Sequence, residues 1–219
     1  MTTEDGFANS RGHASNAFVA RELGRVEGHL RRLVPLLEHR VGQAPRILDF
    51  GCGTGGTSVA LALSRLGPER VVGVDAAAPA LEAAAVRAAG YGLSPPRVQF
   101  VHVAAGEPLS FRHGSFDLVI AVSVVEFITD ARQRRDTVRM LRDAVRPGGH
   151  LFIATPRPGL RELHSGRFLG DLRRAPGQPW ASPSGELAAW AEGWVRETLP
   201  MRERWFTRWQ RLLVQKPAP

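Results

Sequence analysis

The stretch ILDFGCGTGGTSVALA, residues Ile47 to Ala62, decides the fold of this chain. An apolar run leads to Asp49, four glycines follow within the next seven residues, and an apolar helical pattern begins after them. An open α/β sheet uses strand, glycine turn and helix in this order to bring bare backbone close to a ligand. We therefore predict a strand over Arg46–Phe50, a ligand-binding turn, and a helix over Thr57–Leu66.

Two acidic residues narrow the choice of ligand. The glycines alone satisfy GxGxxG, a pattern that is typical of dinucleotide sites but weak without its context. Asp49 lies at the predicted strand end, where a carboxylate would repel a pyrophosphate. Asp75 ends a second apolar strand, Arg70–Asp75, 24 residues after Gly51, where an acid can accept hydrogen bonds from ribose hydroxyls. A ligand with a ribose and an amino group, but without phosphate, fits these residues better than a dinucleotide.

Four segments in register resemble the class I S-adenosylmethionine-dependent methyltransferases. They are Asp49–Gly55, Asp75, Ser115–Val119 and Arg146–Gly149, and their order and spacing match the family over residues 46–156. The resemblance implies S-adenosyl-L-methionine (SAM) as the cofactor and no metal. It also implies a doubly wound, Rossmann-like α/β sheet of seven strands with a C-terminal antiparallel hairpin and an N-terminal helical lid. The alternative is another doubly wound fold with a glycine-rich first turn.

The resemblance implies roles for the residues on the cofactor side. Asp49 lies near the methionine amino group, Asp75 accepts from the ribose hydroxyls, and Gly51, Gly53 and Gly55 form the loop that approaches the cofactor. Four further positions complete the expected cofactor site: Ala76 facing adenine, Ala105 where many relatives carry an acid for the adenine amino group, and Ala121 and Val122 beside methionine. A backbone carbonyl or Glu107 is the expected replacement for that missing acid. Cys52 is interpreted as a small loop residue and not as a nucleophile.

His164 is the candidate general base. It follows the last predicted parallel strand, at the sheet edge where such folds bind ligands, and an unperturbed histidine can accept a proton near neutral pH. Arg161 and Arg167 flank it and can bind a carboxylate or phosphate of a substrate. The alternative is a surface histidine in a basic loop.

Two further residues are candidates on the substrate side. Glu126 stands where relatives often carry Glu-His, and Phe127 replaces the histidine here. Glu126 is either an acid facing the cofactor or substrate, or an acid at a helix start that pairs with an arginine. His29 is the second choice for a base, because N-terminal helices of the resembled family can cover the pocket.

The patterning organises the chain as one domain in four parts. They are a helical cap (1–44), the cofactor-binding core (45–156), a substrate-side loop and helix (157–193) and a closing hairpin (194–219). Apolar periodicity and turn residues predict the other elements. The strands are 97–103, 116–123, 150–155, 194–206 and 209–215, and the helices are 18–39, 79–89, 130–145 and 185–193.

Composition agrees with a globular chain. The 219 residues are 43% hydrophobic, which is enough to bury one sizeable core, and no apolar run is long enough to span a bilayer. The first residues lack the basic-then-apolar layout of a signal peptide. With Cys52 as the single cysteine, an internal disulfide is excluded and a cytoplasmic location is expected. The sequence does not indicate an oligomeric state.

The formal net charge of +8 comes almost entirely from arginine, since Lys216 is the only lysine. No run of five basic residues occurs, and the densest clusters are Arg132–Arg135 and Arg173–Arg174. We interpret the charge, including that of Arg135, Arg139, Arg142 and Arg146 on one helix face, as solvated surface and do not expect nucleic acid as a partner. The predicted function is methylation of a hydroxyl or amine of a small molecule, such as a natural product or a glycan precursor. The alternatives are an RNA or protein methyltransferase and a non-catalytic SAM-binding protein.

Overall fold

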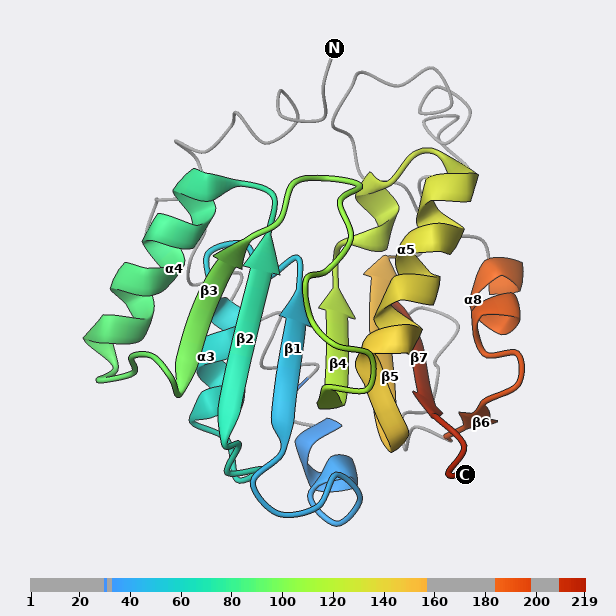
Figure 1. Ribbon diagram of the computed structural model, residues 1–219, viewed down its shortest axis with the longest axis horizontal. Helices are drawn as coiled ribbons and strands as arrows, with labels where there is room; N and C mark the ends of the chain where they lie inside the picture. Colours follow the sequence, from blue (N-terminus) through green and yellow to red (C-terminus); the bar gives the residue numbers. More distant parts are fainter. Residues whose placement is uncertain (1–29, 31–32, 157–183, 198–208) are drawn as a thin grey trace.

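The computed structural model describes residues 30, 33–156, 184–197 and 209–219. These residues form a seven-stranded sheet with the order β3-β2-β1-β4-β5-β7-β6 (Figure 1). The strands are β1 (Arg46–Phe50), β2 (Arg70–Asp75), β3 (Val98–His102), β4 (Phe116–Val122), β5 (Val145–Pro156), β6 (Val195–Arg196) and β7 (Trp209–Gln215). The helices are α3 (Gly56–Ala62), α4 (Ala78–Gly90), α5 (Ala131–Ala144) and α8 (Ser184–Trp190), with a 3-10 turn η1 (Val125–Phe127). The predicted doubly wound sheet and its C-terminal antiparallel pairing are confirmed.

The strand order reverses beside β1. This strand pairs in parallel with β2 on one side and with β4 on the other, so Ile47 lies between Val71 and Leu118. The carboxyl ends of β1 to β5 meet at the upper edge of the sheet in Figure 1. Doubly wound sheets bind their ligands at this edge, where the order reverses. β7 runs antiparallel to β5 and to β6, and β6 is the edge strand.

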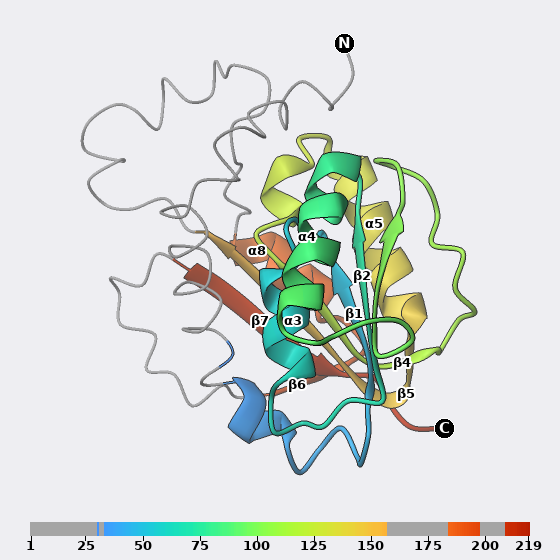
Figure 2. The ribbon, with the colours of Figure 1, turned by 90° about the vertical axis from the view of Figure 1, so that its left-hand side faces the viewer.

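Helices cover both faces of the sheet (Figure 2). One face packs on α3, α4 and the helical residues 33–37, and the other packs on α5 and α8. Successive strand residues point to opposite faces of the sheet. Ile47 and Leu48 are both fully buried, and each packs in a different apolar cluster. Burial on both faces explains why the central strands are almost continuously apolar.

The bounds of β1 and β2 agree with the prediction, but α3 is shorter than predicted. It ends at Ala62 and not at Leu66. The Ser64 hydroxyl donates to the carbonyl of Leu61 at 2.7 Å and accepts from the amide of Leu66 at 3.3 Å. These local bonds compete with the helical ones and form a turn in their place.

Strand β5 begins at Val145 and not at the predicted His150. The segment Arg146–Gly149, which the resemblance placed before this strand, is part of it, and the pairing of β5 with β4 shifts in register beside it. Gly148 there has a φ of +73°, which few other residues adopt. The predicted strand 194–206 is β6 at Val195–Arg196, and its residues 198–206 lie outside the described part.

The other predicted helices differ at their ends. α8 ends at Trp190, because a turn with Gly193 at φ +74° follows it. α5 begins after Asp130, whose Oδ1 accepts from the amide of Gln133 at 2.7 Å, a standard N-cap. Of the predicted helix 18–39, residues 33–37 are described and helical, and most of the remainder lies outside the described residues. No helix in the described ranges is both long enough and apolar enough to cross a membrane.

Candidate active site

The glycine loop, residues 51–56, leaves β1 at the edge where the strand order reverses. The amides of Gly51 and Cys52 donate to the carbonyl of Val74 at 2.8 and 3.0 Å, which fixes the loop to the end of β2. Gly51 has a φ of +69°, and a Cβ there would lie 2.3 Å from Cγ2 of Val124. Only glycine fits this position, because both the backbone conformation and the contact exclude a side chain.

Asp75 ends β2 beside this loop and is buried. Its Oδ2 accepts from the amide of Gly53 at 2.7 Å, and its Oδ1 accepts from the amide of Ala77 at 2.9 Å. A carboxylate offers about four acceptor sites, so each oxygen retains capacity after these bonds. The two amides orient the carboxylate in advance, which suits the pairwise binding of ribose hydroxyls.

Asp49 is the fourth residue of β1, two residues before Gly51, and is only 2% exposed. Its Oδ2 accepts from the hydroxyl of Ser58, on the first turn of α3, at 2.6 Å. The bond joins β1 to α3, the two elements that flank the glycine loop. The predicted role of Asp49 near the methionine amino group stays a prediction.

Cys52 is buried in the same loop. Burial raises the pKa of its thiol well above the usual value, and the charges of Asp49 and Asp75 raise this pKa further. The thiol therefore stays protonated near neutral pH and cannot serve as a thiolate nucleophile. This agrees with its interpretation as a small loop residue.

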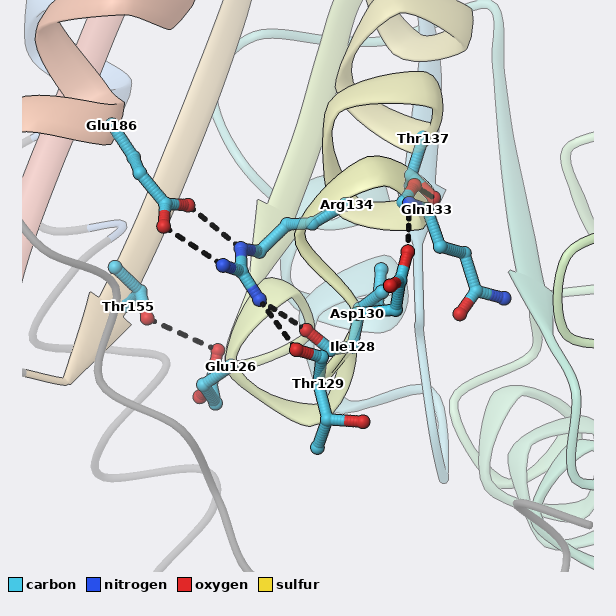
Figure 3. Close-up of polar contacts among 9 residues, drawn as sticks. All are labelled: Glu126, Ile128, Thr129, Asp130, Gln133, Arg134, Thr137, Thr155 and Glu186. Atoms are coloured by element: carbon cyan, nitrogen blue, oxygen red, sulfur yellow. Dashed lines mark hydrogen bonds and ion pairs between the residues drawn. The ribbon is translucent and has the colours of Figure 1, made fainter. Parts of the chain in front are cut away.

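A chain segment that we call the β4–α5 connection, residues 123–130, leaves the neighbouring strand at the same edge. Ala121 and Val122 end β4, and Ser123 turns away with a φ of +60°. The carboxylate of Glu126 is fully buried and accepts from the Ser123 hydroxyl at 2.6 Å. It also accepts from the Thr155 hydroxyl at 3.3 Å (Figure 3). Glu126 thus ties the connection to β5, and its predicted contact with substrate is untested.

The expected adenine side lies beyond β2. His102, at the end of β3, places its Nε2 3.0 Å from the carbonyl oxygen of Ala76. Ala105 lies exposed in the following loop, where the amide of Glu107 donates to the carbonyl of Ala104 at 3.0 Å. The imidazole of His102 therefore lies next to the residue expected to face adenine.

The other predicted residues cannot be placed in the site. His164, Arg161, Arg167 and His29 lie outside the described residues. Among the residues that are described, no group of three histidine, cysteine, aspartate or glutamate side chains could hold a metal ion.

Sequence reasoning missed several residues that support the site. Arg87 of α4 donates to the Thr54 hydroxyl in the glycine loop at 3.0 Å, and Ser58, His102 and Arg134 make the contacts described above and below. The one available signal was the helical spacing of Arg134 with the buried Val138 and Leu141, which places the arginine on the inner face of α5.

The prediction that Arg135, Arg139, Arg142 and Arg146 form a plain solvated helix face is wrong for two of them, and Arg146 lies in β5 and not in α5. Arg142 donates to the carbonyl of Glu192 at 2.7 Å and lies over the ring of Trp194 at 4.8 Å. Arg146 forms an ion pair with Asp117 of β4. Both find partners on neighbouring elements, whereas Arg135 and Arg139 are exposed as predicted.

The fold is that of a doubly wound α/β protein whose glycine loop and buried Asp75 lie where the strand order reverses. Residues 47–149 match the family described as "Methyltransferase domain". The chain is 37% identical over 110 residues to the ubiquinone biosynthesis O-methyltransferase of Sinorhizobium medicae, across 50% of this chain and 40% of that protein. It therefore spans less than half the length of this curated relative.

Solved structures share the fold. A SAM-dependent methyltransferase of Methanosarcina mazei superposes with a TM-score of 0.66 at 21% identity, over 84% of this chain and 98% of that one. Magnesium protoporphyrin IX methyltransferase of Synechocystis PCC 6803, solved with bound S-adenosylhomocysteine (SAH), gives a TM-score of 0.65 at 18% identity, over 89% and 83% of the two chains. The match of residues 47–149 and these shared folds support a class I SAM-dependent methyltransferase family with SAM as the cofactor.

Proposed function

We propose that the protein transfers the methyl group of SAM to a hydroxyl or amine of a small molecule, such as a natural product or a glycan precursor. The observation that carries the cofactor half of this proposal is the carboxylate of Asp75, buried and held by the amides of Gly53 and Ala77. The relative in Sinorhizobium medicae is named an O-methyltransferase, which favours a hydroxyl as the acceptor.

Methyl transfer depends mainly on aligning the acceptor atom, the methyl carbon and the sulfur, and less on reactive side chains. When bound, SAM supplies a methyl group that its sulfonium charge already activates. The glycine loop and Asp75 orient the adenosine part, and Ala121 and Val122 line the methionine side, so that the acceptor atom can approach in line. His164 is proposed as the base that removes the acceptor's proton.

The described surface supports a small acceptor over a nucleic acid. The exposed arginines of α5 are interrupted by Asp136, which pairs with Arg139 at 3.4 Å and with Arg132 at 4.0 Å. Ser123–Glu126 stands where amino-methylating nucleic-acid enzymes of the resembled family carry Asn/Asp-Pro-Pro-Tyr/Phe. A phosphate-binding surface would present its cations without such acidic partners. A cytoplasmic location stays a prediction from the single, buried Cys52.

A methylation assay with isotope-labelled SAM tests the function. Small phenols, other alcohols and amines are offered separately from bulk RNA and protein. Label transfer to a small hydroxyl or amine compound is expected. Transfer to RNA or protein alone would establish the competing function, and SAH binding without transfer to any acceptor would indicate a non-catalytic protein.

His164→Ala tests the proposed base once an acceptor is found. Turnover should fall by roughly 10²–10⁴-fold, because a positioned base contributes about this factor, while the dissociation constant of SAH stays constant. The acid limb of the pH–rate profile should disappear. A variant with wild-type turnover and pH profile would reduce His164 to a surface residue. A raised KM at unchanged kcat would assign it to substrate positioning.

A further inference from the structure

The β4–α5 connection is held in place by side chains from outside it. Its backbone starts in a left-handed conformation at Ser123, which costs about 1–2 kcal/mol for a residue with a side chain. Glu126 accepts a hydrogen bond from Thr155 and so connects the segment to β5. Val124 packs against Gly51 so closely that a Cβ at residue 51 would have no room. A segment with this strain keeps its shape only if the surrounding contacts maintain it.

Arg134 holds the far end of this connection. Its side chain is 2% exposed, on the inner face of α5. Nε and one terminal nitrogen donate to the two carboxylate oxygens of Glu186 in α8, at 2.7 and 2.8 Å. The other terminal nitrogen donates to the carbonyl of Ile128 and, at 3.5 Å, to that of Thr129 (Figure 3). One planar guanidinium thus joins α8 to the backbone of the connection.

The burial of this ion pair argues against a role in stability alone. Taking an arginine and a carboxylate out of water is costly, and well-packed apolar side chains of similar volume are often as stabilising. What apolar residues cannot do is hold two backbone carbonyls in a fixed direction. Arginine suits this task because its five donors form a rigid fork. Asp136 on the same helix forms exposed ion pairs with Arg132 and Arg139. Among the described bonds, neither of these arginines donates to a backbone carbonyl.

We propose that Arg134 is a positioning residue for cofactor binding, and that Glu186 fixes its orientation. Arg134 holds Ile128 and Thr129, the connection in turn holds Val124, and Val124 packs against Gly51 of the glycine loop. The amide of Gly53 in this loop donates to the carboxylate of Asp75. The chain of contacts therefore ends at the carboxylate that is expected to bind the ribose of the cofactor. Loss of the pair should loosen the loop and weaken SAM binding without removing any group that touches SAM.

The experiment measures the dissociation constant of SAH by calorimetry, well below the unfolding temperature of every variant. Arg134→Met removes the fork, and Glu186→Gln keeps the shape of the partner but removes its charge. Asp136→Asn is the matched control, because it removes the partner of two exposed arginines on the same helix. Thermal midpoints are recorded with and without saturating SAH.

Both test variants should raise the dissociation constant roughly 3- to 30-fold, the range of couplings seen for residues that touch neither ligand, and the control should stay within about twofold. The shift in thermal midpoint caused by SAH should shrink in both. A merely structural pair would lower the midpoints with and without SAH together and leave the dissociation constant unchanged, which would overturn the proposal. If Arg134→Met fails to fold, Glu186→Gln decides, since Glu186 is partly exposed.

The route through Val124 has its own test. In a double-mutant cycle, the effects of Glu186→Gln and Val124→Ala on the dissociation constant of SAH should be less than multiplicative, because both act on one contact with Gly51. Independent, multiplicative effects would overturn this route. The measurement uses SAH alone, so its outcome is separate from whether a small molecule accepts the methyl group.

Discussion

Two segments leave adjacent strands at the same edge of the sheet, and they are held by different means. The glycine loop after β1 is fixed by backbone bonds to Val74 and by the absence of side chains at Gly51. The β4–α5 connection is fixed by side chains, chiefly those of Glu126 and Arg134. The first segment can be recognised in this sequence, because an apolar strand followed by closely spaced glycines is a local pattern. The second depends on partners far along the chain.

Gly51→Ala should have the largest effect on stability, because it disturbs the contact between the two segments. The new Cβ would lie 2.3 Å from Cγ2 of Val124 at a φ of +69°. Overpacking costs about 1–3 kcal/mol and the left-handed conformation about 1–2 kcal/mol, so the free energy of unfolding should fall by roughly 2–5 kcal/mol in urea titrations.

Gly53→Ala is the matched control for this prediction. It has a φ of +52° but no atom within 4 Å of its Cβ position, so it should lose only the roughly 1–2 kcal/mol of conformational strain. Adding Val124→Ala to Gly51→Ala should recover part of the loss. Equal losses in the two glycine variants would show that the contact with Val124 is unimportant.

Asp75→Asn should weaken cofactor binding more than it weakens the fold. An asparagine keeps one acceptor oxygen for Gly53 or Ala77 but loses the charge offered to the ribose. Hydrogen bonds to a charged group contribute about 1.5–3 kcal/mol, so the dissociation constant of SAH should rise roughly 10- to 100-fold in calorimetry.

Asp117→Asn is the control for Asp75→Asn. Asp117 lies near the start of β4 and binds the backbone amide of Arg46 at 2.7 Å and the side chain of Arg146. Its replacement should lower stability and leave the affinity for SAH unchanged. An Asp75→Asn variant with wild-type affinity would remove this carboxylate from the cofactor site.

The sequence was sufficient for those parts of the site that backbone geometry dictates. The bounds of β1 and β2 and the positions of the glycine loop and Asp75 could be predicted, because strand periodicity and glycine turns are local signals. The order and spacing of four short motifs then allowed the family to be identified. For β1 and β2, the conformation that the local sequence favours is the one that the structure has.

The sequence was insufficient where side chains act over distance. Arg134 lies in the densest described cluster of basic residues, and a solvated surface was the simple interpretation. Its partner Glu186 is 52 residues away, and no local pattern connects them. The turn at Ser64 was missed for a different reason, since serine bonds to its own backbone in competition with the helix.

Glu126→Gln tests whether the β4–α5 connection depends on its buried carboxylate. Glutamine keeps one acceptor oxygen, so one of the bonds from Ser123 and Thr155 is lost or reversed. The loss of a hydrogen bond to a charged group predicts a decrease of about 1.5–3 kcal/mol in the free energy of unfolding. The exposed Glu107→Gln serves as the control and should change it by less than about 0.5 kcal/mol. Equal stability of both variants would contradict a tie at Glu126.

His150 gives the smallest expected effect and lies away from both segments. It pairs with Leu118 and Gln215 in the sheet and is fully buried. Neither ring nitrogen has a hydrogen-bond partner among the described residues. Burial lowers the pKa of its imidazole; the charge of Glu197 opposes this, and those of Arg40 and Arg146 add to it. Because the folded pKa lies below the unfolded value of about 6.5, protons bind preferentially to the unfolded chain.

Stability from this residue is therefore complete above about pH 6.5 and is lost as the pH falls toward the folded pKa, by at most about 1.4 kcal/mol per pH unit. His150→Leu should remove this part of the pH dependence, since leucine cannot be protonated and fits an apolar strand position. Urea titrations of wild type and variant between pH 7.5 and 5.5 make the comparison. Parallel stability curves for the two proteins would mean that His150 is protonated at no cost in the folded sheet. If the stability of the wild type approaches that of the variant as the pH rises, the buried imidazole is compatible with the fold only in its neutral form.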